Sequence, residues 1–210
     1  MINFAFSDLL FILPAIIISL SFHEFSHAFS AYQLGDSTAK NAGRLSLNPL
    51  RHIDPIGLLA LMFFRFGWAK PVPVNPYQFR NVDEKTGMLL TALAGPMSNV
   101  LLCFIGVGVF TFIPDYFLYT MPWLYRFLVY FCSINASLAF FNLIPVPPLD
   151  GSKILFGLLP DRFYHGAQVV EQYGFVILLL LIFGNVPSRI IGPLSNGLVN
   201  SFVKLFSLFN

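Results

Sequence analysis

Long apolar segments are the feature that most constrains this chain. The first runs from about Leu9 to Leu34 and is broken only by His23 and Glu24, so it exceeds the ~20 residues that a helix needs to cross a bilayer. Comparable segments cover residues 86–113, 121–144 and 173–183. Of the 210 residues, 56% are hydrophobic and 10% are charged, whereas soluble domains are about 25% charged. We therefore expect an all-α polytopic membrane protein.

The rest of the composition supports a single domain surrounded by lipid, residues 1–210. The C-terminal segment 186–209 is apolar but rich in Gly, Pro, Ser and Asn, so it could be a further span or an interfacial helix. No basic residue precedes Lys40, whereas a cleaved signal peptide begins with a basic region, so we expect the first segment to be retained. The net charge of +2 is small and dispersed, which excludes nucleic acid as a partner.

Residues 36–85 do not fit the pattern of a membrane span. Their charge-free run, residues 55–64, has ten residues, a length that suits a re-entrant or interfacial piece. In the following stretch, Pro71 and Pro73 stand at alternate positions, which is incompatible with a helix and suits an edge strand. We predict a small strand and re-entrant excursion at about residues 40–80, on one side of the membrane.

The basic residues predict an orientation. With five spans, all twelve Lys and Arg residues except Arg126 and Arg189 would lie on the side of that excursion. Short loops rich in Lys and Arg stay in the cytoplasm. This predicts an integral membrane protein with its N-terminus outside and its C-terminus in the cytoplasm.

The first apolar segment contains an H-E-x-x-H pattern, residues 23–27. Residues four apart share one face of a helix, so His23 and His27 can bind one metal ion, with zinc as the expected metal. Glu24 can then act as general base toward water at that metal. Ionisable groups in a span cost about 2.5–3.5 kcal/mol each, which indicates a functional site. The alternative is a hydrogen-bonded polar cluster that joins two helices.

A catalytic zinc usually has three protein ligands, so a third must come from elsewhere. His52, His165 and several acidic residues are available. Asp150 stands out because it follows a proline-rich stretch, residues 142–149, at the end of the third long segment. Unwound backbone at membrane depth is tolerated only around a polar cavity, and the five-span topology brings this end to the side where the first segment ends.

Three motifs in this order closely resemble the site-2 protease family of intramembrane zinc metalloproteases. They are HEFSH at 23–27, AGPMSN at 94–99 and FNLIPVPPLDG at 141–151. The resemblance covers about residues 10–160, as a three-helix catalytic core, and leaves accessory C-terminal helices at about 170–209. The chain resembles the short prokaryotic form of the family, which lacks a PDZ domain and a cystathionine-synthase-type regulatory domain.

The resemblance also implies roles for individual residues. It implies that His23, His27 and Asp150 bind one Zn²⁺ per chain and that Glu24 is the catalytic acid and base. It suggests that Asn142 and Asn99 lie near the substrate carbonyl, and Gly95 with Pro96 predicts a kink that could admit the Asn99 amide, or a packing kink. His52 has two interpretations: a contact to substrate or to water at the zinc, or an interfacial histidine bonded to Asp54 or to backbone.

The activity implied is cleavage of a peptide bond in or near a transmembrane segment, in regulated intramembrane proteolysis. The partner would be a single-pass membrane protein in a prokaryotic cell membrane. Residues 71–76, or the strands expected around residues 44–47, could pair with it by strand addition or pack as plain loops. A metal-binding or transport protein is the alternative, but a transporter should show a chain of ligands and inverted repeats. A non-catalytic scaffold would have no need of Glu24.

Overall fold

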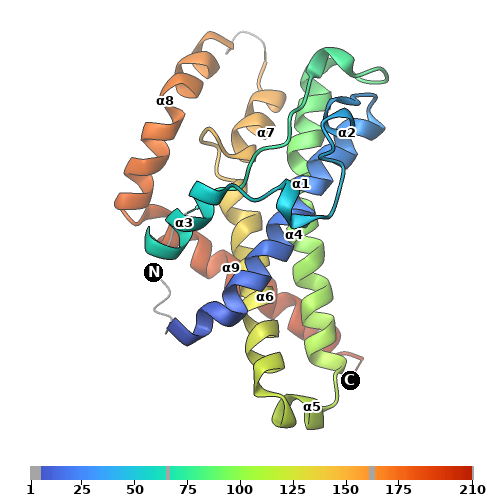
Figure 1. Ribbon diagram of the computed structural model, residues 1–210. Helices are drawn as coiled ribbons and strands as arrows, with labels where there is room; N and C mark the ends of the chain where they lie inside the picture. The colour runs from blue at the N-terminus through green and yellow to red at the C-terminus, as the bar shows by residue number, and fades with distance from the viewer. Residues whose placement is uncertain (1–5, 65–66, 161–163, 210) are drawn as a thin grey trace.

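The computed structural model describes residues 6–64, 67–160 and 164–209 (Figure 1). Short 3₁₀ turns lie at Phe6–Asp8, Pro49–Arg51 and Pro76–Gln78. The α-helices are α1 (Leu9–Gln33), α2 (Thr38–Asn41), α3 (Pro55–Phe64), α4 (Glu84–Phe112), α5 (Asp115–Thr120), α6 (Pro122–Asn142), α7 (Asp150–Leu158), α8 (Tyr164–Phe183) and α9 (Val186–Phe206).

Three helices, α1, α4 and α6, are long and apolar enough to cross a membrane. Each coincides with a predicted span, so the all-α polytopic class is confirmed. α4 begins a little earlier than predicted because the Asp83 side chain accepts the backbone N–H of Thr86 at 2.9 Å and caps the helix. It then continues through Pro96 as one helix.

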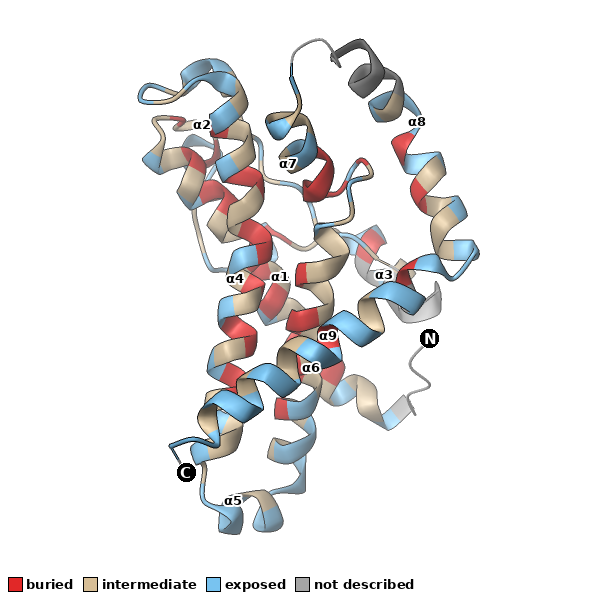
Figure 2. Cartoon of the chain, turned by 180° about the vertical axis from the view of Figure 1, so that it is seen from behind, coloured by how far each residue is buried: buried red, intermediate tan, exposed pale blue. Residues whose placement is uncertain are grey.

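Small side chains let these three helices approach closely. Ala15 of α1 packs with Leu102 of α4 and Phe131 of α6. A Cβ on Gly106 of α4 would lie 2.9 Å from the Cys132 sulfur of α6, so glycine permits this crossing. Close contact between small residues stabilises helix pairs in lipid. The buried positions accordingly follow the facing sides of the three helices (Figure 2).

The predicted strands in the region of residues 40–80 are not found, and this part of the prediction is wrong. The described residues contain no strand, and the pairing is limited to an isolated antiparallel bridge between Ile53 and Ala69. Pro71 and Pro73 have no N–H to donate, so the extended chain around them cannot form a ladder. The ten-residue run predicted as a re-entrant piece is α3.

The C-terminus lies beside α5, at the end of the bundle opposite α2 (Figure 1). The prediction that it lies on the same side as residues 36–85 is therefore wrong. α8 starts near α7 and descends only part of the way, and α9 continues obliquely to the α5 end (Figures 1 and 2). α9 is held against α4 by aromatic contacts, in which the Phe104 ring lies 5.2 Å from that of Phe202 and 4.8 Å from that of Phe206.

Candidate metal centre

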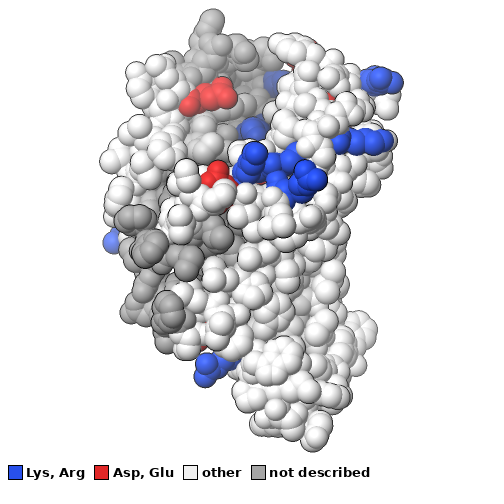
Figure 3. Space-filling view, in the orientation of Figure 1, with Lys and Arg blue, Asp and Glu red and all other residues white. Residues whose placement is uncertain are grey.

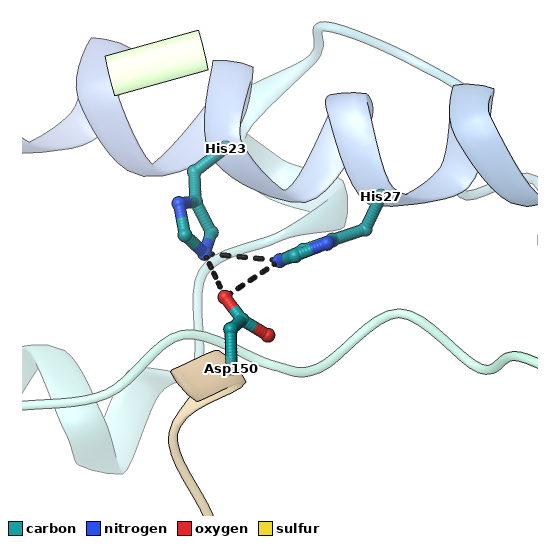
Figure 4. A group of neighbouring side chains, drawn as sticks. All are labelled: His23, His27 and Asp150. Atoms are coloured by element: carbon teal, nitrogen blue, oxygen red, sulfur yellow. Dashed lines mark hydrogen bonds and ion pairs between the residues drawn. The ribbon is translucent and has the colours of Figure 1, made fainter. Parts of the chain in front are cut away.

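Three side chains from two helices converge on one point (Figure 4). His23 and His27 lie one turn apart on α1, and Asp150 is the first residue of α7. Each Nε2 atom lies 3.1 Å from Oδ2 of Asp150, and the two Nε2 atoms are 3.0 Å apart. All three residues are buried. Within the described chain, these residues form a group that could hold a metal ion.

The hydrogen bonds behind the imidazoles determine which nitrogen atoms face the group. His23 Nδ1 is 2.7 Å from Oδ1 of Asn99, and His27 Nδ1 is 2.7 Å from the carbonyl oxygen of Thr91. Both partners are acceptors, so each Nδ1 carries the proton and each Nε2 presents a lone pair. This arrangement is typical of metal-binding histidines, whose other nitrogen donates to a second group.

A cation fits this arrangement of donors. Two lone pairs and a carboxylate oxygen face one another, and Oδ2 of Asp150 is buried without a hydrogen-bond partner. Zinc with bonds of about 2.0–2.1 Å in tetrahedral geometry would separate its ligands by about 3.3 Å, close to the spacing observed. Burial raises the pKa of the Asp150 carboxyl, but without a metal His23 and His27 can be protonated at Nε2, and their hydrogen bonds and positive charge outweigh burial and hold that pKa well below its usual range. The carboxylate is therefore an anionic ligand at neutral pH.

Two glycines make this convergence sterically possible. A Cβ on Gly95 of α4 would lie 2.4 Å from Nε2 of His27 and 2.6 Å from Cε1 of His23, so any other residue would displace the imidazoles. A Cβ on Gly151 would lie 2.3 Å from the carbonyl oxygen of Leu143, where the chain leaves α6 and turns into α7. The glycines of the AGPMSN and FNLIPVPPLDG motifs thus leave the space that the three side chains need to converge.

Glu24 lies beside the ligands on α1 and is only 8% exposed. Its Oε2 accepts the backbone N–H of Val72 at 3.1 Å. Val72 belongs to residues 70–75, an extended stretch that crosses this face of the site and that we name the strap. The strap overlaps residues 71–76, which the sequence predicted as a segment that could pair with a substrate.

Two further charged side chains hold the strap. Nη2 of Arg44 donates to the carbonyl oxygens of Lys70 and Pro71, the latter at 3.2 Å. Oδ2 of Asp36 accepts the backbone N–H of Asn75 at 2.7 Å. Burial lowers the pKa of the Arg44 guanidinium, while the Glu24 carboxylate opposes this. The bonds of Arg44 and Asp36 to the strap were not predicted from the sequence, because they join segments far apart in the chain.

A cavity of about 480 Å³ lies between the metal ligands, Glu24 and the strap. The remainder of its wall is largely apolar and includes Leu20 of α1, Leu138 of α6 and Leu178 of α8. An apolar segment of another molecule would therefore meet a wall of matching polarity. The sequence did not predict that α8 contributes to this wall.

Asn142 and Asn99, both predicted near the substrate carbonyl, lie in different surroundings. Asn142 lines the cavity, and its Nδ2 donates to the carbonyl oxygen of Leu138 at 3.0 Å. Asn99 has no exposed surface and accepts a hydrogen bond from His23. Its geometry is therefore that of a residue that positions His23, and differs from the predicted contact with substrate.

His52 lies away from the metal cavity. Its imidazole is 1% exposed, and Nε2 donates to the carbonyl oxygen of Ser46 at 2.6 Å, which is a bond to backbone. It borders a second cavity, of about 290 Å³, between α1, α3 and α6. The side chain of His165 lies outside the described residues.

Comparison with known proteins relates the chain to peptidases. The family model described as "Peptidase family M50" matches residues 118–182, which include Asp150. The protein YwhC of Bacillus subtilis is 36% identical over 201 residues, which cover 94% of this chain and 91% of YwhC. MJ0611 of Methanocaldococcus jannaschii is 32% identical over 71% of this chain and 72% of its own length.

A third relative is longer than this chain. Rip2 of Mycolicibacterium smegmatis is 29% identical over 79% of this chain, and the match spans 64% of Rip2. The names of all three relatives class them as zinc metalloproteases. No solved structure matches the chain.

Proposed function

This chain belongs to peptidase family M50, the site-2 protease family, and on that premise we propose that it is an intramembrane zinc metalloprotease. Its reaction is hydrolysis of a peptide bond in or near a transmembrane segment of a single-pass membrane protein. The observation that carries this proposal is the convergence of His23, His27 and Asp150 beside Glu24, in a cavity bordered by membrane-length helices. One Zn²⁺ per chain would be held by the three ligands.

Residues of the chain itself would transfer the proton, exclude other water and donate a hydrogen bond to the oxyanion. When bound, zinc would supply a Lewis acid that polarises the scissile carbonyl and makes water more acidic. Glu24 takes a proton from the attacking water on a carboxylate oxygen and passes it to the leaving amine nitrogen. The apolar cavity wall keeps other water away from these groups. Nδ2 of Asn142 carries two N–H donors, so it can donate one to the developing oxyanion while the other stays bonded to Leu138.

The substrate must present an extended backbone, because a helix hides its carbonyl groups in its own hydrogen bonds. The strap is itself extended and borders the cavity through Pro71, Val72 and Val74. Pairing of the unwound substrate with the strap is therefore part of the proposal. Deletion of residues 71–76 should abolish cleavage and leave zinc bound, and unchanged proteolysis would rule out this docking.

We also propose an orientation in the membrane. The α2 end of the bundle carries most of the basic side chains visible on one face (Figure 3). Lys40 lies in α2 itself, and the backbone N–H of Arg80 donates to the carbonyl oxygen of Leu34 at the same end of α1. By the positive-inside rule this end faces the cytoplasm, so the α5 end and the C-terminus beside it face outside. Tags accessible to impermeant reagents at either end would test this.

The decisive experiment compares wild type with Glu24→Gln, each co-expressed with a panel of single-pass membrane proteins. Wild type should generate new substrate fragments, and the variant should lose about 10²–10⁴-fold in cleavage rate while retaining about one zinc per chain. Cleavage that persists in the variant would rule out the mechanism. Metal transport, the competing function, would continue in Glu24→Gln and would be seen as zinc uptake into vesicles.

A further inference from the structure

We propose that Asn135, on α6, is a positioning residue for the metal centre. It acts two hydrogen bonds away, through Asn99, and determines which nitrogen of His23 carries the proton. This inference rests on the metal centre of the proposed function, but it concerns binding of the metal, which is measured separately from proteolysis.

A continuous chain of hydrogen bonds joins α6 to the first metal ligand. Nδ2 of Asn99 donates to Oδ1 of Asn135 at 3.0 Å, and Oδ1 of Asn99 accepts Nδ1–H of His23 at 2.7 Å. Asn99 and Asn135 have no exposed surface, and His23 is 4% exposed. Because water cannot replace a partner at these positions, each bond has to be made within the protein.

The direction of this chain is fixed from α6. Nδ2 of Asn135 donates to the carbonyl oxygen of Phe131 at 2.9 Å, which leaves its Oδ1 to accept. Asn99 must then present its Nδ2 to Asn135, and the same Nδ2 lies 3.3 Å from the carbonyl oxygen of Ser19. A primary amide has one donor side and one acceptor side, so the Asn99 oxygen is left for His23.

The consequence is a defined tautomer of His23. With its proton on Nδ1, Nε2 presents a lone pair toward Asp150. If the Asn99 amide flipped, its Nδ2 would face Nδ1, and the proton would move to Nε2, where it blocks metal binding. His27 has no such weakness, because its Nδ1 donates to the backbone carbonyl of Thr91, which cannot exchange donor for acceptor.

The test measures the zinc affinity of the purified full-length protein by chelator competition. Asn135→Ala should raise the zinc Kd about 10–100-fold, as removal of outer-shell partners of metal-binding histidines commonly does. The same substitution in an Asn99→Asp background should change the zinc Kd much less. An ionised carboxylate has acceptors only, so it holds the Nδ1 proton of His23 whether or not Asn135 is present.

Controls separate positioning from folding. Cys132→Ala removes a buried side chain of α6 that takes no part in this hydrogen-bond chain, and it should leave the zinc Kd unchanged. Equal losses of affinity in the wild-type and Asn99→Asp backgrounds, or no loss in either, would overturn the proposal. If Asn135→Ala does not fold, ¹⁵N NMR of the metal-free wild type still decides: His23 should be protonated at Nδ1, and protonation at Nε2 would overturn the inference.

The result is independent of the proposed protease activity. A wild-type chain that binds zinc and cuts no substrate would refute the proposed function, while the dependence of the zinc Kd on Asn135 would still stand. Conversely, proteolysis that needs Glu24 but tolerates Asn135→Ala with unchanged zinc affinity would refute this inference alone.

Discussion

The backbone N–H of Val72 donates to Oε2 of Glu24 at 3.1 Å. The carboxylate proposed as the general base is therefore bonded directly to the strap, the segment proposed to meet the substrate. Any movement of the strap changes the surroundings of Glu24. The order of residues 70–75 should thus be coupled to catalysis and have little effect on zinc binding, because no strap residue is a metal ligand.

Arg44→Leu tests this coupling. The buried guanidinium bonds two strap carbonyls, and hydrogen bonds to charged groups contribute about 1.5–3 kcal/mol. Amide exchange in peptides containing Val72 should become roughly 10–100-fold faster, cleavage should fall, and zinc content should stay the same. Exchange is measured by mass spectrometry. Arg51→Leu, which removes an exposed cation at the same end, serves as the control, and equal effects of the two substitutions would contradict the prediction.

Gly95→Ala should damage the metal centre. The new Cβ would lie 2.4 Å from Nε2 of His27, so both imidazoles must shift, and we expect the zinc Kd to rise at least about 10-fold. Gly197→Ala on α9 is the matched control, because nothing lies within 4 Å of the added Cβ. It should leave the zinc Kd unchanged and stabilise the helix by about 0.5–1 kcal/mol. An unchanged zinc Kd in Gly95→Ala would show that the close approach is not required.

Features encoded within one segment were predictable from the sequence. The lengths of α1, α4 and α6 follow from uninterrupted apolar runs, and the common face of His23 and His27 follows from the helical period. The position of Asp150 was harder to predict, because its approach to α1 depends on a turn between two helices. The proline-rich stretch before it gave a physical reason to expect that turn.

Features that depend on contacts between distant segments were not predictable. Several asparagines lie in apolar helices, and the sequence does not distinguish Asn135 from the others. Its proposed role depends on α4, which brings Asn99 within hydrogen-bond distance of it. The strap was expected to be strand, but its proline residues removed the donors, and side chains hold it instead. The oblique course of α9 depends on packing against α4 and α6, which hydropathy does not encode.

Asp150→Asn should abolish high-affinity zinc binding. The substitution replaces an anionic ligand with a neutral amide of similar size, so packing is retained while charge is lost. Because Asp150 is proposed as a ligand itself, the loss should exceed the ~100-fold limit usual for outer-shell changes. Asp54→Asn, which alters a helix-capping carboxylate away from the metal cavity, is the control. Equal zinc content in Asp150→Asn and wild type, measured by metal analysis, would contradict the assignment.

Zinc affinity should rise with pH across the imidazole range. Imidazoles ordinarily have a pKa of about 6.5, and each must lose its second proton before Nε2 can bind a cation. Well below that pH, log Kd should fall by about two for each pH unit, because two histidines release protons. The Asp150 carboxyl adds nothing to this slope, since its pKa lies well below the usual range and it is already ionised. His27→Ala should reduce the slope to about one, and calorimetry in buffers of different ionisation enthalpy counts the released protons directly. A slope near zero in the wild type would mean that the imidazoles do not bind the ion.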